Sequence, residues 1–153
     1  MTNLSGLRRS ILATQTTPQR PEGRQVAVFM TAVDRRRVRR RLHAPDGVEV
    51  RLALPTGTVL TPGTVLAVQD GVSYVVEAAP EDVAVLRPRS MTEAVAVAHA
   101  VGNLHRDFIP ADEAGVFLAL WDAPLELLLT RQGVPFTREE RPFHGRPGWE
   151  HEG

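Results

Sequence analysis

The sequence predicts an α+β protein in which an N-terminal all-β domain is followed by a ferredoxin-like βαββαβ domain. Three observations lead to this class. Short alternating strand patterns separated by turn residues fill the first half, capped helix patterns appear only in the second half, and there they alternate with strands in the order strand, helix, strand, strand, helix, strand. The predicted domains are residues 1–80, with residues 1–24 expected to form a loose start, then the ferredoxin-like domain 81–143, and a flexible tail 144–153.

The expected β domain is built from runs rich in β-forming residues. Residues 25–33 form one such run, and residues 38–55 contain two strands around the turn 44–47, which has Pro at its second position and Gly at its fourth. Further turns at Pro62-Gly63 and Asp70-Gly71 divide the rest into short strands, which indicates a small sheet or barrel. One buried face of the hairpin is expected from four apolar residues that alternate with less apolar ones: Val48, Val50, Leu52 and Leu54.

The first helix of the second domain has recognisable start and stop signals. Ser90 followed three residues later by Glu93 is a capping box, and Gly102 and Asn103 are residue types that end helices in the left-handed conformation. Apolar residues between these signals fall at three- and four-residue spacing, which predicts a core-facing stripe. This stripe comprises Met91, Ala94, Val95, Ala98 and Val101.

The second helix follows the same logic. Asp122 is a suitable N-cap with Pro124 in the first turn, and Gly133 stops a helix body at residues 125–132. Four short apolar segments surround the two helices and complete the predicted sheet. They are residues 83–88, 107–111, 115–120 and 134–140.

Several classes of function are disfavoured by what the sequence lacks. There is no cysteine, so disulfides, thiolate metal sites and cysteine nucleophiles are excluded, and any metal must be bound by imidazole and oxygen. No serine lies in a nucleophile elbow, and there is no phosphate-binding glycine loop, so we expect no enzyme. No apolar run is long enough to span a membrane and the start lacks a signal-peptide pattern, which favours the cytoplasm.

Histidines are the remaining candidates for chemistry. His43 and His99 lie in a strand and a helix, and their positions favour a structural or solvated role. His105 differs because it follows the Gly-Asn helix end, where a side chain can be held out at the surface. One imidazole binds a metal poorly, but two copies related by a dimer axis can share nickel, copper or zinc.

The stretch "GNLH" (102–105), followed by a strand pair and "WDAPLELLLTRQG" (121–133), resembles the UreE-type urease accessory proteins, the nickel metallochaperones of urease maturation. That family has a Gly-Asn-Arg-His segment and a following Asp-x-x-Leu-Glu helix. The similarity continues upstream through residues 34–71 to the family's N-terminal β domain, and it covers roughly residues 26 to 145.

The resemblance implies a cytoplasmic homodimer that binds one nickel ion through His105 of both chains. His144 and His151 are candidate equivalents of the family's C-terminal ligands, and zinc or copper are expected to bind in vitro. The implied partners are the urease accessory GTPase and the apo-urease complex. The sequence departs from the family in two ways. Trp121 and Ala123 flank Asp122, where some members have a His-x-His pair, and the tail lacks the long histidine run of some members.

Two other classes of function remain open. The arginine run "RRRVRRR" (35–41) would serve nucleic-acid binding, but Val38 and Leu42 place it on a strand and aromatic residues are only 5% of the chain, so no nucleic-acid partner is expected. The second is a metal-independent assembly module in which the edge of the hairpin accepts an extended peptide.

Overall fold

The computed structural model describes residues 9–16, 21 and 23–147 of the chain. Contacts divide it into two compact units, residues 1–78 and 79–153. The division falls two residues before the predicted one, because Pro80 already begins the first strand of the second unit. None of the helices in the described ranges is both long and apolar enough to cross a membrane. The α+β class predicted from the sequence is confirmed.

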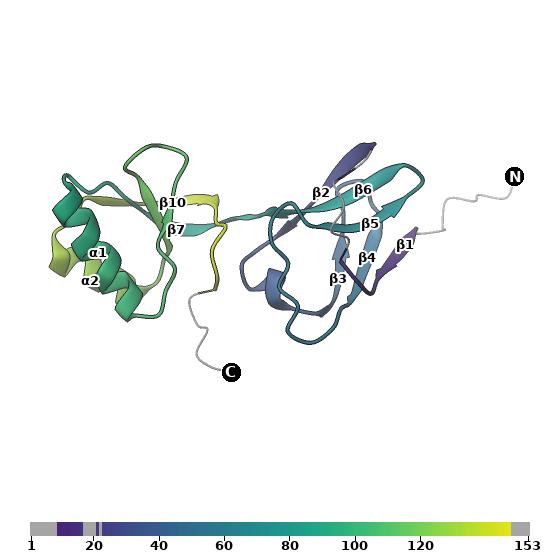
Figure 1. The fold of residues 1–153 in the computed structure, drawn as a ribbon, viewed down its shortest axis with the longest axis horizontal. Coiled ribbons are helices and arrows are strands. Elements are labelled where there is room, and N and C mark those ends of the chain that lie inside the picture. Colours follow the sequence, from purple (N-terminus) through teal and green to yellow (C-terminus); the bar gives the residue numbers. More distant parts are fainter. Residues whose placement is uncertain (1–8, 17–20, 22, 148–153) are drawn as a thin grey trace, which may run out of the picture. The chain divides into compact units, whose positions relative to one another are not determined.

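The N-terminal unit contains two three-stranded sheets, ordered β1-β4-β3 and β2-β6-β5 (Figure 1). The expected loose start is wrong for Ser10–Ala13, which pair in parallel with Glu49–Leu52, and Ala13 is buried. Pairing satisfies the backbone groups of this segment, which explains its order. The strands are β1 Ser10–Ala13, β2 Arg24–Met30, β3 Arg39–His43, β4 Glu49–Ala53, β5 Val65–Gln69 and β6 Val72–Ala78.

One apolar core serves both sheets of this unit. The predicted alternation is confirmed, since Val48, Val50, Leu52 and Leu54 are all buried. From the other sheet, Val28, Met30 and Val76 contribute to the same cluster and are almost wholly buried. Tyr74 is also buried, and its hydroxyl donates a hydrogen bond to Asp46 at 2.8 Å. Burial and this hydrogen bond raise the pKa of Tyr74.

The arginine run does not form one basic strand. Its first residues belong to a 3-10 turn, Asp34–Arg36, and only Arg39–His43 is a strand. Arg35 is 3% exposed and its Nη1 donates to the carbonyl oxygen of Met30 at 2.8 Å, while Arg40 forms an ion pair with Asp34. Part of the run therefore stabilises the β domain, so not all of its arginines are available to bind the phosphates of a nucleic acid.

The second unit has the ferredoxin-like arrangement. Its antiparallel sheet is ordered β10-β7-β9-β8, and the elements follow one another as β7, α1, β8, β9, α2, β10. Figure 1 shows α1 and α2 together beside this sheet. The elements are β7 Pro80–Leu86, α1 Met91–Asn103, β8 Ile109–Pro110, β9 Phe117–Leu120, α2 Ala123–Gln132 and β10 Phe136–Pro142.

Both helices begin at the predicted caps. Ser90 Oγ accepts from the amide of Glu93 at 3.1 Å, and Asp122 Oδ1 accepts from the amide of Leu125 at 2.9 Å. Gly133 ends α2 in the left-handed conformation. Between helices and sheet lies a second apolar core, formed by Ala84, Leu86, Val97, Val101, Ala119, Leu125, Leu129 and Val134.

The predicted core stripe of α1 is confirmed for Val101 and wrong for Met91 and Val95. Val97 and Val101 face the core, whereas Met91 is 79% exposed and Val95 is 61% exposed. The helix carries apolar residues on two faces. The 3.6-residue period identifies both faces as apolar, but it does not distinguish the face that packs on the sheet.

Replacing Arg35 with Ala should lower the free energy of unfolding by about 2 kcal/mol, because a buried hydrogen bond and its packing are lost together. Chemical denaturation of the purified protein measures this. Arg37, which is exposed in the same run, is the matched control. Arg37→Ala should change stability by less than about 0.5 kcal/mol. Equal effects of the two substitutions would contradict a structural role for Arg35.

Candidate functional site: the corner at His105

His105 stands at a sharp backbone corner directly after α1. The helix continues through Gly102 and Asn103, and Leu104 caps it with φ −83°. The left-handed residue is His105 itself, with φ 58°, so the expectation that Gly102 and Asn103 take that conformation is wrong. The amide of His105 donates to the carbonyl oxygen of Gly102 at 2.9 Å, which closes the corner.

This backbone conformation is unusual for a residue with a side chain. Positive φ is strained outside glycine, although Asn, Asp and His adopt it more often than other residues do. Such strain persists where neighbouring contacts enforce it, and it gathers at functional sites. In the described ranges only Asp70 shares this feature with His105 among non-glycine residues. The His105 side chain is exposed, so the corner presents it at the surface.

Arg106 ties the corner to the start of α2. Its guanidinium forms an ion pair with Asp122, the residue that caps α2. The side chain of Arg106 is 15% exposed, and its Nε is buried without a hydrogen-bond partner in the described part of the chain. The Asp122 carboxylate therefore fixes both the helix start and the residue that follows His105.

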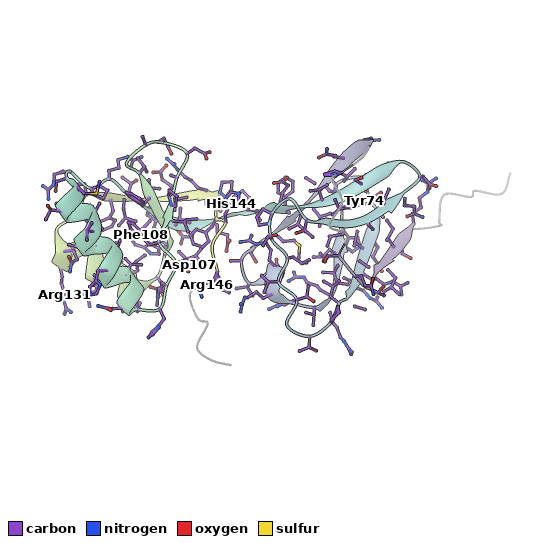
Figure 2. All side chains as sticks on the ribbon, in the orientation of Figure 1. Tyr74, Asp107, Phe108, Arg131, His144 and Arg146 are labelled. Carbon is purple, nitrogen blue, oxygen red and sulfur yellow. The ribbon has the colours of Figure 1, made fainter. Side chains whose placement is uncertain are left out.

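Asp107 ties the corner to the C-terminal segment. Its Oδ2 accepts from the backbone amide of Arg146 at 2.7 Å, and its Oδ1 accepts from Arg146 Nε at 2.9 Å and Nη2 at 2.6 Å (Figure 2 labels both residues). The carboxylate raises the pKa of Arg146. We call this set of three hydrogen bonds the Asp107–Arg146 clamp.

The clamp belongs to a segment that was predicted as flexible tail. Phe143 is wholly buried, and Pro147 is buried as well. A Cβ atom added to Gly145 would lie 2.7 Å from the Phe143 ring and 3.1 Å from the Asp107 Cβ, so only glycine fits without displacement. We call residues 143–147 the strap. The predicted tail is thus wrong for residues 144–147, because Phe143 and Arg146 fasten them; His151 lies outside the described residues.

His105 lines a small hollow of about 240 Å³, whose other walls are Gly102, Arg106, Arg146 and Pro147. His144 lies elsewhere, in a hollow of about 470 Å³ together with Asp112, Glu113 and Arg141. One chain therefore does not bring His105 and His144 into the same hollow. In residues 9–16, 21 and 23–147 no three His, Asp or Glu side chains form a group that could hold a metal ion.

The exposed apolar face of α1 leads to this corner. Met91, Val95, Ala98 and Gly102 follow one another at intervals of four, three and four residues, so they lie on one side of the helix. Ala98 is half-buried and the other three are exposed. A Cβ added to Gly102 would meet no atom within 4 Å, so the space above it is open. We call these four residues the α1 stripe.

His43 and His99, for which a structural or solvated role was expected, are not among the residues that line the His105 hollow. His43 Nε2 is 3.9 Å from Glu49 across the β3–β4 pair, and His99 is exposed on α1. Sequence reasoning missed the three charged residues around the corner, Arg106, Asp107 and Arg146. Arg106 and Asp107 follow His105 directly, and this proximity could have identified them as part of the site. Nothing in the sequence pattern distinguished Arg146 from the other arginines.

Comparisons with known proteins agree on one family. Residues 8–79 match the family model described as UreE urease accessory protein, N-terminal domain. The chain is 69% identical to the urease accessory protein UreE of Deinococcus radiodurans over the whole of both chains. It is 51% identical to that of Synechococcus sp. (strain JA-3-3Ab), covering 83% of this chain and 85% of the relative.

A more distant relative shows the same relationship. The urease accessory protein UreE of Geobacillus kaustophilus is 33% identical, over 83% of this chain and 84% of the relative. The full-length match means that the ferredoxin-like unit and its His105 corner lie within the similarity, and not the β domain alone. The resemblance inferred from "GNLH" and its surroundings is therefore confirmed, and the chain belongs to the UreE family of urease accessory proteins.

Proposed function

We propose that this protein is a cytoplasmic nickel metallochaperone whose homodimer binds one Ni²⁺ ion between the His105 side chains of two chains. It binds and hands over an ion and does not catalyse a reaction. The observation that carries the proposal is the placement of His105: an exposed imidazole on a left-handed corner, at the end of the exposed α1 stripe. Membership of the urease accessory family supports nickel as the ion that is bound and delivered.

The α1 stripe supports a second copy as the partner of this surface. Met91 and Val95 are large apolar side chains that gain by burial, and Ala98 and Gly102 are small enough for two helices to approach closely. A twofold axis near Gly102 would bring each His105 close to its symmetry mate, since residues on an axis meet their own copies. Each corner would then provide one imidazole, and borderline divalent ions such as nickel bind imidazole well.

Such a site suits delivery better than storage. Two imidazoles leave coordination positions open, so a partner can add its own ligands before the ion departs, whereas a closed cage of protein ligands must first break. The open site would exchange ligands with a urease accessory GTPase, and the apo-urease complex would receive the ion downstream. His151 would add a ligand from the C-terminal end, while the position of His144 beside Asp112 and Glu113 favours a separate role.

The first prediction concerns stoichiometry. A chain that ends at Pro147 keeps the strap and lacks His151, so calorimetric titration should saturate at about half a nickel ion per chain because a twofold site is shared. The full-length protein should bind at least as tightly. One tight ion per truncated chain would rule out a shared site.

The second prediction concerns His105 itself. His105→Asn removes the imidazole while keeping a residue that tolerates positive φ, so tight nickel binding should be lost and the free energy of unfolding should change by less than about 0.5 kcal/mol. His99→Asn, on the exposed side of α1, is the control and should leave nickel binding intact. Normal nickel binding by His105→Asn would place the site elsewhere.

The third prediction concerns the α1 stripe. Val95→Glu should convert the dimer to a monomer in sedimentation experiments without nickel, because burying an unpaired carboxylate in an apolar interface is costly. Val68→Glu is a matched control, since Val68 is 57% exposed on β5 of the other unit. A Val95→Glu protein that stays dimeric would show that the dimer uses another surface.

A further inference from the structure

The sheet β1-β4-β3 of the N-terminal unit presents an arginine-rich face to solvent (Figure 1 shows its three strands). On β4, Val50 and Leu52 are buried, so Arg51 between them points away from the core. On β3, Arg41 is the direct partner of Arg51 and therefore shares its face, and Arg39 lies two residues along on the same face. All three arginines are exposed.

An exposed leucine completes this face. Leu12 on β1 is the direct partner of Arg51 on the side away from Arg41, and it is 55% exposed. Directly opposite residues have Cβ atoms about 5 Å apart, and residues two apart on a strand are separated by about 7 Å. Three guanidinium groups are therefore gathered beside one apolar side chain. We call Leu12, Arg39, Arg41 and Arg51 the basic face.

The chain does not balance the charge of this face. Like charges directly opposite each other destabilise a sheet, and Arg41 and Arg51 are such a pair. In the described part of the chain, none of the three guanidinium groups has a hydrogen bond or an ion pair. By contrast, Arg40, on the other side of β3, is paired with Asp34. A departure from local rules of this kind is expected at a functional surface.

We propose that the basic face is a docking surface for an acidic segment of a partner protein. Its carboxylates would pair with the three arginines, since the planar guanidinium group binds a carboxylate through two parallel hydrogen bonds. An apolar side chain of the segment would pack on Leu12. Arginine is enriched in protein interfaces, and an apolar contact surrounded by polar groups is their usual arrangement. The inference goes beyond the proposed function and does not depend on the nickel site.

The composition of the face favours a protein over a nucleic acid. Proteins that bind duplex DNA neutralise several phosphates along a regularly charged backbone. The basic face offers three arginines around a leucine, and on the next rung Glu49 lies opposite His43, with 3.9 Å between Glu49 Oε2 and His43 Nε2. The Glu49 carboxylate would repel phosphate. Carboxylates on separate side chains can instead be placed to meet the arginines alone.

The experiment uses the full-length protein and a fluorescein-labelled synthetic peptide with glutamates on both sides of a central leucine. Fluorescence anisotropy gives the peptide affinity at low ionic strength and again at about 0.15 M salt, where exposed charges are screened more strongly. One control peptide has glutamine in place of each glutamate, and another has serine in place of the leucine. A labelled single-stranded oligonucleotide of equal net charge is the comparison for nucleic acid.

The variants are Arg41→Gln, Arg51→Gln and the double variant. We expect each single substitution to weaken binding of the acidic peptide about threefold and the double variant about tenfold, because exposed ion pairs are lost one at a time. Arg131→Gln is the matched control, since Arg131 is an exposed arginine on α2 of the other unit. It should bind the peptide as the parent does. The serine peptide should bind more weakly than the leucine peptide, and the glutamine peptide should not bind.

Arg51→Glu separates lost docking from misfolding. It replaces the like-charged pair with an opposite-charged one, so the melting temperature without peptide should rise by about 2 °C while peptide binding is lost. A lower melting temperature would show that Arg51 already has a stabilising partner within the chain, and the inference would be overturned.

Three further results would contradict the inference. They are equal peptide binding by the parent and the arginine variants, tighter binding of the oligonucleotide than of the peptide, and a changed oligomeric state of the arginine variants in sedimentation. The second would assign the face to nucleic acid and the third to another copy of this chain. Nickel binding should match the parent in every variant, so a failure here is distinguishable from a failure of the proposed function.

Discussion

His105 can hold its left-handed backbone only because the two residues after it are fastened to different parts of the domain. Arg106 is paired with Asp122 at the start of α2, and Asp107 is clamped to Arg146 in the strap. The preceding residue, Leu104, is fixed by the last turn of α1. The corner is thus held on three sides, which is the condition under which a strained residue persists. Because the corner is fixed in this way, the imidazole of His105 stays exposed beside the strap.

In this arrangement the pairs Arg106–Asp122 and Asp107–Arg146 do more than stabilise the fold. Exposed ion pairs contribute little to the free energy of folding, because water screens them and ordering the side chains costs entropy. The two pairs around His105 are each partly buried, and they determine geometry: the direction in which the chain leaves α1 and the position of the strap. A metal ligand needs such support, since residues behind a ligand orient it as much as the ligand's own rotamer does.

Much of the fold was predictable because local signals are strong. Ser90, Asp122 and Gly133 act through contacts within a few residues, and the alternation from Val48 to Leu54 records one buried face. The core face of α1 was not predictable from its period, because Met91 and Val95 are as apolar as Val97 and Val101. Long-range contacts were also beyond reach: Asp107 and Arg146 are 39 residues apart, so nothing in the local pattern joins them. Arg35 could not be recognised as a buried residue either, because it stands in a run of arginines that the sequence alone does not distinguish from one another.

The proposed function requires one nickel ion on a twofold axis between two His105 side chains. A crystal structure of the nickel-loaded protein, with anomalous scattering recorded at the nickel absorption edge, tests it most directly. We expect one anomalous peak for each pair of chains, within bonding distance of a His105 nitrogen from both. A peak inside a single chain, or one bound by His144 with Asp112 and Glu113 and not by His105, would contradict it.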